Sequence, residues 1–437
     1  MTISERQESR QASVLNHFVF RILPALLTAM AIALPTAAGI PEAPVLLGSG
    51  GSGGDKVMAW NPGHYVKWTM TRVWDEKKDR RGSHYEKALQ YYENSAWCTT
   101  DEGYASHQGI QAFVHWRNFE PRKRGQYDWT MADNIIKSAQ HRCGAGNRRV
   151  FFILKLEAES QFYDWGPASG GKACAPQWVW DANRVVVNEN IGVGVGHCIA
   201  AVWDPEIRAA FYDYVRAFAA RYKDHPLVEG FSISGEGSKG WIKRSQDPKG
   251  FSIGEYYRVH RGAVLTLRSA APAKLVGFGT NHYGAATWSE VVKQTCIDTP
   301  GCLFVWPDTV ADRNKNFPHT KAHKEYCALS GQIGLMAGLQ GAKYSWRNSP
   351  TPDDPTESAF NHCCDAQTVP TDNNGNIDSY CATHAAWSPK STNVDGTLVT
   401  SRTIIAKLTE KRARVYSTNC PSNITKAGFK CITGAVP

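Results

Sequence analysis

Carboxylic acids closely follow several strand-like runs of this sequence. Glu236 stands between two glycines after one such run, and Glu157 and Asp308 each come within two residues of the end of another. Two carboxyl groups in one site can divide the work of hydrolysis, since one protonates a leaving oxygen while the other attacks or activates water. We predict Glu236 as the general acid, or acid/base, and Asp308 or Glu157 as the second carboxylate. For any single acid, a buried structural ion pair is the alternative.

Aromatic rings and hydrogen-bonding groups occur beside these acids. Rings stack on the faces of sugars, whereas amides, imidazoles and charged groups hold sugar hydroxyls. The combination therefore predicts a carbohydrate as the substrate. Burial in the core is the alternative for each tryptophan. The predicted substrate-binding residues are Trp116, Arg117, Glu120, Asn281, His282, Trp306, Gln340, Tyr344 and Trp346.

Short apolar runs alternate with longer amphipathic stretches, which is typical of βα units and a parallel sheet. The most distinct helix has Asp204 as its N-cap and Pro205 at its first position. In a βα barrel the residues after the strands share one end of the barrel, so the acids would meet there. We predict strands at 57–60, 109–116, 149–156, 228–234, 274–280, 302–306, 333–340 and 413–417, with helices at 127–141, 204–222, 253–270, 320–330 and 401–412.

The predicted fold class is α/β, a (β/α)8 TIM barrel over residues 56–437 with disulfide-held loop insertions. Residues 158–203 separate a strand from its helix and are numerous enough to form a wall of a binding cleft. Residues 348–389 are rich in Pro, Asp, Asn, Thr and Cys and have little periodicity. We interpret them as a loop insertion over the barrel mouth.

Two segments resemble one enzyme superfamily. Residues 116–129 read WRNFEPRKRGQYDW, and residues 218–236 read FAARYKDHPLVEGFSISGE. They look like the segments after the second strand and through the fourth strand of TIM-barrel glycoside hydrolases, including relatives of β-galactosidases, xylanases and cellulases. The resemblance implies a barrel fold and assigns the acid/base role to Glu236.

The chain departs from that pattern at two positions. Gly235 stands where the family has Asn before its acid/base, and Gln340 stands where the seventh strand supplies a Glu nucleophile. Pro307-Asp308 together with Gln340 is similar to a poorly described subset of these barrels. Because an amide cannot serve as a carboxylate nucleophile, we predict inversion of configuration through a water activated by Asp308. Gln340 also motivates the alternative function, a carbohydrate-binding pseudoenzyme.

A metal-dependent hydrolase or polysaccharide deacetylase is a third hypothesis. The sequence has no C-x-x-C pair, and His319-x-x-x-His323 fits a helix surface better than half of a zinc site. We therefore predict neither a metal nor a cofactor. The net charge is 49 − 40 = +9 without a basic stripe. This balance argues against nucleic acid as a partner and allows weak attraction for an anionic polymer.

The amino terminus predicts export. The apolar run 22–34 is shorter than the roughly 20 residues of a membrane span, and Pro35 and small residues follow it. We interpret residues 1–38 as a signal peptide and 39–55 as a Gly/Ser-rich linker, with an uncleaved anchor as the alternative. The expected location is secreted or periplasmic, without membrane contact after cleavage. The oligomeric state is left open.

Twelve cysteines fit an oxidised, exported protein in which all of them pair. Proximity in the sequence favours Cys296 with Cys302 and Cys420 with Cys431. Cys363 and Cys364 are adjacent and are expected to bond to separate partners, for which Cys327 and Cys381 are candidates.

Overall fold

The chain divides into two units, residues 1–50 and 51–437, and every residue described here belongs to the second. The structure is a computed structural model. It describes residues 56–69, 92–141, 148–159, 175–191, 195–235, 251–280, 286–309, 328–339, 383–387, 391–392, 398–399, 401–410 and 419–433.

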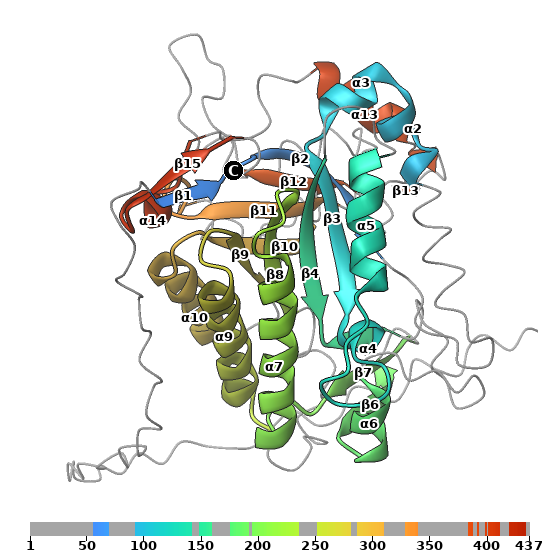
Figure 1. Cartoon of the computed structure of the whole chain (residues 1–437), viewed down its shortest axis with the longest axis vertical. Coiled ribbons are helices and arrows are strands. Elements are labelled where there is room, and N and C mark those ends of the chain that lie inside the picture. Colours follow the sequence, from blue (N-terminus) through green and yellow to red (C-terminus); the bar gives the residue numbers. More distant parts are fainter. Residues whose placement is uncertain are drawn as a thin grey trace, which may run out of the picture. The chain divides into compact units, whose positions relative to one another are not determined.

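Eight parallel strands close into a barrel (Figure 1). Each strand pairs with its neighbour in the chain order of the barrel strands, and the last pairs with the first, so the predicted (β/α)8 fold is confirmed. Around the ring the strands are β2 (Gly63–Thr69), β3 (Gly109–His115), β4 (Arg149–Lys155), β8 (Val228–Gly235), β9 (Leu275–Thr280), β10 (Cys302–Thr309), β11 (Gly334–Leu339) and β12 (His384–Trp387).

The first strand, predicted at residues 57–60, exists, but its predicted place in the barrel is wrong. Residues Lys56–Ala59 form β1, which lies outside the barrel and pairs in parallel with β15 (Phe429–Ile432). The barrel begins one run later, at Gly63, whose φ of +141° suits a residue without a side chain. Strand β2 was not predicted because β2 carries a histidine and a lysine among its apolar residues.

The prediction that residues 413–417 close the ring is also wrong. Strand β12 closes the ring at residues that the sequence analysis placed in the loop insertion 348–389, and residues 413–417 lie outside the described part of the chain. Only four residues long, β12 has no β-branched side chain, so propensity does not reveal it. Its junction with β2 is fastened by the indole of Trp387, which donates to Nδ1 of His64 at 2.9 Å.

Alternating residues divide the strands between two hydrophobic cores. Phe113, Phe151, Ile153, Leu303 and Met336 belong to a cluster inside the barrel. Their neighbours along each strand face the surrounding helices in a second, larger cluster. This period of two identifies which strand residues point inward.

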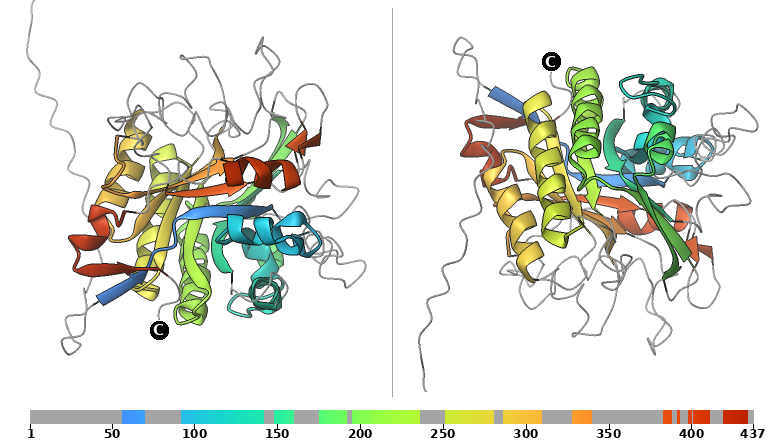
Figure 2. Two further views of the ribbon diagram at one scale, coloured as in Figure 1. Left: turned by 90° about the horizontal axis from the view of Figure 1, so that it is seen from above. Right: turned by 90° about the horizontal axis from the view of Figure 1, so that it is seen from below.

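The helices that follow the strands pack on the outer surface of the barrel (Figure 2). As predicted, α7 begins after Asp204, whose Oδ1 accepts hydrogen bonds from the backbone N–H groups of Glu206 at 3.0 Å and Ile207 at 3.3 Å. None of the helices in the described part of the chain is both long and apolar enough to span a membrane. The outer helices are α5 (Thr130–His141), α7 (Pro205–Tyr222), α9 (Ile253–Ala270), α10 (Ala286–Asp298), which the sequence analysis missed, and α13 (Ser401–Glu410).

A small antiparallel sheet follows β4 at the carboxyl end of the barrel. It consists of β5 (Glu157–Glu159), β7 (Val195–Ala200) and β6 (Val185–Ile191), in that spatial order, with α6 (Gln177–Asp181) preceding β6. Figure 1 shows this sheet and α6 at the end to which the arrowheads of β3 and β4 point. The long excursion after β4 therefore adds structure at the functional end of the fold.

The opposite, amino end of the barrel is closed by the two ends of the domain. Trp60 and Met58 reach the interior core from the β1 side, and Ile424 reaches it from α14 (Ser422–Thr425). The backbone N–H of Trp60 donates to the carbonyl of Ile432 at 2.9 Å. The shorter elements α2 (Ala96–Thr99), α3 (Asp101–Ser106), β13 (Ser391–Thr392) and β14 (Leu398–Val399) complete the described structure apart from α4, introduced below.

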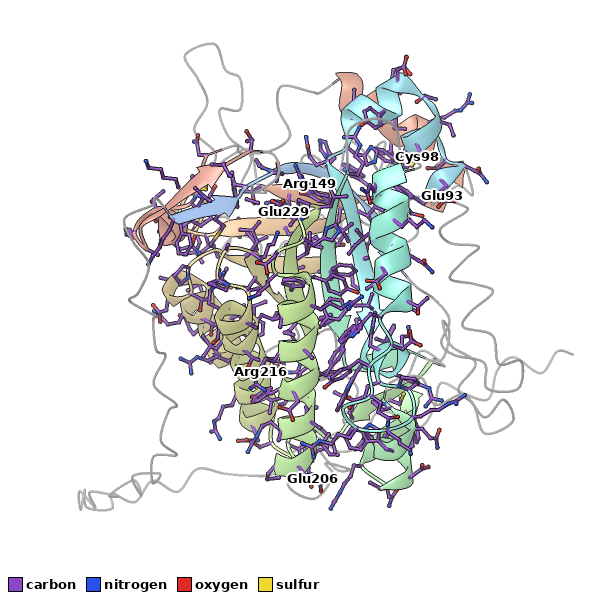
Figure 3. All side chains as sticks on the ribbon, viewed as in Figure 1. Glu93, Cys98, Arg149, Glu206, Arg216 and Glu229 are labelled. Atoms are coloured by element: carbon purple, nitrogen blue, oxygen red, sulfur yellow. A yellow bond between two sulfur atoms is a disulfide. The ribbon has the colours of Figure 1, made fainter. Side chains whose placement is uncertain are left out.

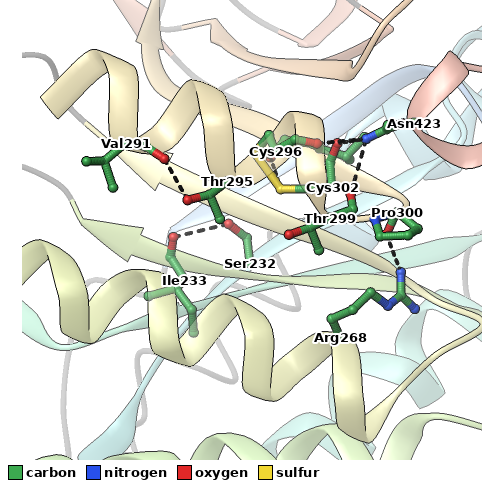
Figure 4. Close-up of a disulfide and its surroundings, with 11 residues drawn as sticks. Ser232, Ile233, Arg268, Val291, Thr295, Cys296, Thr299, Pro300, Cys302 and Asn423 are labelled. Atoms are coloured by element: carbon green, nitrogen blue, oxygen red, sulfur yellow. Dashed lines mark hydrogen bonds between the residues drawn. A yellow bond between two sulfur atoms is a disulfide. The ribbon is translucent and has the colours of Figure 1, made fainter. Parts of the chain in front are cut away.

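Both nearby disulfide pairings predicted from the sequence are confirmed. Cys420 bonds to Cys431 beside β15, and Cys296 at the end of α10 bonds to Cys302 at the start of β10. Asn423 fastens the second bridge to α14, because its amide donates to the carbonyls of Cys296, Thr299 and Cys302 at 3.0–3.3 Å (Figure 4). All six cysteines in the described part of the chain, including Cys98 and Cys198, are disulfide-bonded.

Candidate active site at the carboxyl end of the barrel

Two of the three predicted acids lie on described backbone at the carboxyl end of the strands. Glu157 is the second residue after β4, and Asp308 is the penultimate residue of β10. Glu236 directly follows β8 in sequence and lies outside the described residues, as do Asn281, His282, Gln340, Tyr344 and Trp346. For Glu157, Trp306 and Asp308 the description covers the backbone alone.

The pairing of β4 with β8 extends to the carboxyl ends of both strands. Lys155 lies beside Ser234 in the parallel register, at the last rung of this pair. Ser232 is buried and points into the barrel. Its Cβ lies close to Gly277 of β9, which also faces inward: a Cβ atom added at Gly277 would come within 2.6 Å of the Cβ of Ser232. The next inward position of β8 in a period of two is 234, and the chain of β4 leaves the barrel after this rung, where Glu157 pairs with Ile199 of β7.

A bulge in β10 changes which of its residues align with the inward positions of β11. Val305 lies beside the inward-facing Met336, and Trp306 lies beside Ala337. The register then shifts, so that Thr309 lies beside Leu339. Three residues of β10 therefore span two of β11, so the strict alternation that Val305 begins is interrupted between Trp306 and Thr309.

Two lysines that the sequence analysis did not select lie inside the barrel. Lys67 of β2 and Lys155 of β4 hold their ammonium nitrogens 5.0 and 5.3 Å from the ring centroid of Phe113, on the strand between them. Lys67 is 4% exposed, whereas Lys155 is half-buried. The interior core places Phe113 below the carboxyl ends of the strands. A signal for both lysines exists in the sequence, since each shares the inward parity of its strand.

Two further polar side chains of β3 share this inward face. Gln111 is fully buried, and its amide nitrogen donates to the sulfur of Met336 at 2.9 Å. His115, also fully buried, ends β3 beside Lys155 in the register. The described part of the upper barrel interior is therefore lined by hydrogen-bond donors and two cations.

The motif after β3 takes a different position from the one predicted. Trp116 begins the short helix α4 (Trp116–Phe119), is fully buried, and stacks on Tyr214 of α7 with ring centroids 6.0 Å apart. Its indole N–H donates to a carboxylate oxygen of Glu120 at 2.6 Å. These contacts lie in the core between barrel and helices. They favour the packing alternative for Trp116 over a sugar platform.

Glu120 connects the two ends of this motif. It accepts the indole N–H of Trp116 and the backbone N–H of Gly125, so it braces the turn that leads to α5. Burial raises the pKa of Glu120 to about 7, although both hydrogen bonds lower it. Arg117, also buried, directs its guanidinium toward the carbonyl of Ala175 at 3.4 Å and the side chain of Gln177 at 3.5 Å.

A second buried acid lies at the amino end, away from the candidate site. Glu229, the second residue of β8, accepts hydrogen bonds from the backbone N–H of Asn61 at 2.8 Å and from its side-chain amide at 2.6 Å. Burial raises the pKa of Glu229, while Asn61, Arg149 and Lys274 oppose that shift. Figure 3 shows Glu229 and Arg149 at this end, opposite Glu206 at the start of α7. The position favours a structural role, because barrel enzymes work at the carboxyl end.

Within the described residues, no group of three or more His, Cys, Asp or Glu side chains has the geometry to hold a metal ion. The donors that the described site offers are lysine, histidine and amide groups. These suit hydrogen bonds to hydroxyl groups and contacts with carboxylates.

No protein-family model matches the sequence, and no curated protein matches it at a significant level. One solved structure similar to the chain is a GH5_18 protein from Streptomyces cattleya in complex with GlcNAc. The two sequences are 15% identical, the alignment covers 83% of this chain and 82% of that chain, and the TM-score is 0.49. A β-mannanase from the blue mussel Mytilus edulis has 12% identity, coverage of 84% and 99%, and a TM-score of 0.47. The endo-glycoceramidase II of a Rhodococcus species has 12% identity, 80% coverage of both chains and a TM-score of 0.48. All three are glycoside hydrolases, the class whose motifs the sequence resembles.

Proposed function

We propose that the protein is an exported glycoside hydrolase that acts on an oligo- or polysaccharide. The observation that supports the proposal is the closed barrel of parallel strands, in which β4 ends two residues before Glu157, β8 ends one residue before Glu236, and β10 contains position 308 next to its last residue. Three carboxylic acids at one end of such a barrel supply the acid and base that cleavage of a glycosidic bond requires.

In the proposed reaction, Glu236 donates its proton to the glycosidic oxygen as the bond to the anomeric carbon breaks. Asp308 removes a proton from a water molecule, and the resulting hydroxide attacks the anomeric carbon from the opposite face. The leaving sugar departs with the proton of Glu236, and Asp308 ends the cycle protonated. The donors Lys155, His115 and Gln111 lie below this region, and residues 281, 282, 306, 340, 344 and 346 are the proposed sugar contacts.

The decisive experiment compares hydrolysis with binding on one panel of polysaccharides. Wild-type protein should release reducing sugar from at least one member, and Glu236→Gln should lower turnover by about 10²- to 10⁴-fold, the usual contribution of general acid catalysis. Because Gln preserves the shape of the side chain, the melting temperature should stay unchanged. Full activity of Glu236→Gln would remove this residue from the mechanism.

A carbohydrate-binding pseudoenzyme is the second candidate, and Gln340 is the observation that favours it. An amide after the seventh strand cannot form the covalent intermediate of a retaining enzyme. Binding to a polysaccharide without release of reducing ends, from wild type and variant alike, would establish this alternative.

The proposal of export rests on the disulfides and on the sequence of residues 1–38. Six of six described cysteines are bonded, as expected of a protein that folds in an oxidising compartment. Expression with its own first 38 residues, followed by amino-terminal sequencing of the protein outside the cell, tests both export and cleavage.

A further inference from the structure

Three histidines lie at the amino ends of three strands that are consecutive around the barrel. His384 begins β12, His64 is the second residue of β2, and His107 comes two residues before β3. His384 lies beside Gly63 in the register, and the backbone N–H of Gln108 donates to the carbonyl of His64 at 2.7 Å. None of the three side chains is more than 6% exposed. This histidine cluster therefore spans the junction at which β12 closes the barrel on β2.

Hydrogen bonds fix two of these rings in a neutral form. Nδ1 of His64 accepts the indole N–H of Trp387 at 2.9 Å, so this nitrogen carries no proton. Nδ1 of His107 lies 2.8 Å from the carbonyl of Gly103, which can only accept, so this nitrogen carries the proton. Nε2 of His107 then accepts from the hydroxyl of Tyr92 at 3.0 Å. Each ring thus uses one nitrogen as an acceptor and has no second proton.

The ring of His384 is neutral for a different reason. The hydroxyl of Thr383 gives its single proton to the carbonyl of Leu335 at 3.0 Å, so it accepts from Nδ1–H of His384 at 2.9 Å. In the described part of the chain, Nε2 of His384 is buried without a hydrogen-bond partner. The ring packs against Trp60 and Tyr65, with centroids 5.1 and 5.6 Å apart. A proton on Nε2 would therefore place a positive charge in an aromatic core.

The charged neighbours of His64 and His107 oppose a second proton on either ring. The guanidinium of Arg148 donates to the backbone carbonyl of His107 at 2.6 Å and lies over the ring of Tyr104. His64 and His107 repel each other when both are charged. The described acid beside Tyr92 is Glu93, which accepts a hydrogen bond from Ser138 of α5. The other described titratable side chains of α3 and α13 are exposed, namely Asp101, Glu102 and Arg402.

The groups inside the barrel near His384 do not supply a lasting negative charge either. Tyr65, which contacts His384, interacts electrostatically with Glu229 of β8 and Arg149 of β4. Glu229 is held by Asn61, and Lys274 also faces it. Burial raises the pKa of Glu229, so this acid becomes neutral as the pH falls. The ammonium of Lys67 lies farther along β2, at the ring of Phe113.

These surroundings give all three histidines the same pH dependence. Burial lowers the pKa of His64, His107 and His384 from 6.5 to about 3, and neighbouring positive charge contributes for the first two. Since the folded pKa is below the unfolded value, the open form binds more protons, and stability is lost as the pH falls below 6.5. Each histidine then favours the open form by about tenfold per pH unit.

We propose that the histidine cluster is an acid-sensitive switch that opens the amino end of the barrel before the rest of the fold. A second proton on His64 removes the acceptor of Trp387, so β12 separates from β2. Protonation of His107 releases α2 and α3 in the same step. Strand β4 and helix α7 contain no histidine and keep their structure. No covalent bond changes, so the amino end closes again when the pH is raised.

The test is hydrogen exchange of the full-length protein at pH 7 and pH 5, expressed as protection factors. At pH 5 each of three histidines contributes about 30-fold, so protection of residues 63–69, 92–107 and 383–387 should fall by roughly 10⁴-fold. Residues 149–155 and 205–222 should remain protected, and protection should return at pH 7. An equal loss throughout the chain, or unchanged protection at the histidine cluster, would overturn the inference.

Glutamine variants identify the groups that take up the protons, because glutamine keeps a donor and an acceptor but does not titrate. His107→Gln and His384→Gln should each make the loss of protection about 30-fold smaller at pH 5. The matched control is His260→Gln on α9, where the histidine is equally buried and burial lowers its pKa to about 4. This control should behave as wild type. An equal rescue by His260→Gln would indicate acid unfolding of the whole chain and contradict the switch.

Histidine NMR signals of the wild-type protein decide the question if a variant fails to fold. With ¹³C-labelled histidine, the signals of His64, His107 and His384 should keep the shifts of neutral rings between pH 7.5 and pH 6. Exposed histidines titrate over that range, since their ordinary pKa is about 6.5. Fewer than three non-titrating signals in the folded protein would overturn the inference.

Discussion

At the scale of single residues, Glu120 illustrates how a motif typical of an enzyme can serve the fold. Its carboxylate has no exposed surface and accepts hydrogen bonds from Trp116 and Gly125. A carboxylate with these two donors holds the chain between β3 and α5 in one path. The resemblance of residues 116–129 to glycoside hydrolases therefore reports on how the barrel is built as much as on its chemistry.

The raised pKa of Glu120 predicts a stability that depends on pH. The folded pKa of about 7 exceeds the unfolded value near 4.3, so the native state binds more protons between these values. The contribution of Glu120 to the free energy of unfolding is therefore greatest below about pH 4 and is lost as the pH rises through 7. Denaturant unfolding at pH 5 and pH 8 should show a decrease of at most about 3 kcal/mol from this group.

Glu120→Gln should flatten that pH dependence while keeping an acceptor for Trp116. The matched change Glu206→Gln, at an exposed position in the first turn of α7, should leave the pH dependence as in wild type. Equal slopes for wild type and Glu120→Gln would show that Glu120 does not carry this effect.

At the scale of elements, the spacing of strands predicts the stereochemistry. Strands β8 and β10 are separated by β9, so their ends are about 9–10 Å apart, whereas the adjacent β4 and β8 are about 5 Å apart. The wider separation leaves room for the water of an inverting mechanism, and the narrower one suits a retaining mechanism. With Asp308 as base, proton NMR should show an inverted anomer as the first product, and Asp308→Asn should be inactive. Retention would indicate Glu157 instead.

Helix α7 is the element that ties the barrel to its outer layer. Phe218 is fully buried, and its ring contacts Phe119, Phe152, Trp129 and Phe231 with centroids 5.1–6.0 Å apart. Phe218→Ala should lower the free energy of unfolding by about 3–5 kcal/mol. On the same helix, Arg216→Ala removes an exposed ion pair with Asp213 and should cost about 0–1 kcal/mol. Denaturant titration of both variants provides the comparison.

The sequence predicts elements well where local signals are strong. Six barrel strands and α7 were predicted because long apolar runs and an N-cap with proline mark them. Strands β2 and β12 were missed because an inward lysine and a four-residue length weaken those signals. The bulge in β10 could not be foreseen, since it arises from pairing with β11. For the same reason Lys67 and Lys155 became candidates only once the barrel interior was defined.

At the scale of the whole molecule, the disulfide beside β15 stabilises the closure of the amino end. A bridge over 11 residues, Cys420–Cys431 restricts the unfolded chain, and its loss should cost about 3 kcal/mol. The double change to serine should therefore lower the melting temperature without altering sugar binding, because the candidate site lies at the other end. A loss of binding in the folded double variant would contradict the separation of the two ends.

The parallel pairing of β1 with β15 also brings the two ends of the domain close together. Lys56 lies beside Phe429, so residues 56 and 433 are about 14 Å apart by strand geometry. A short glycine linker could join them, and the chain could then be reopened at another connection without breaking the ring of strands. The order in which the eight βα units follow one another would change, while their arrangement around Phe113 would not. New termini placed at the carboxyl end would lie beside the candidate site, whereas the present ends of the domain lie at the closed amino end of the barrel.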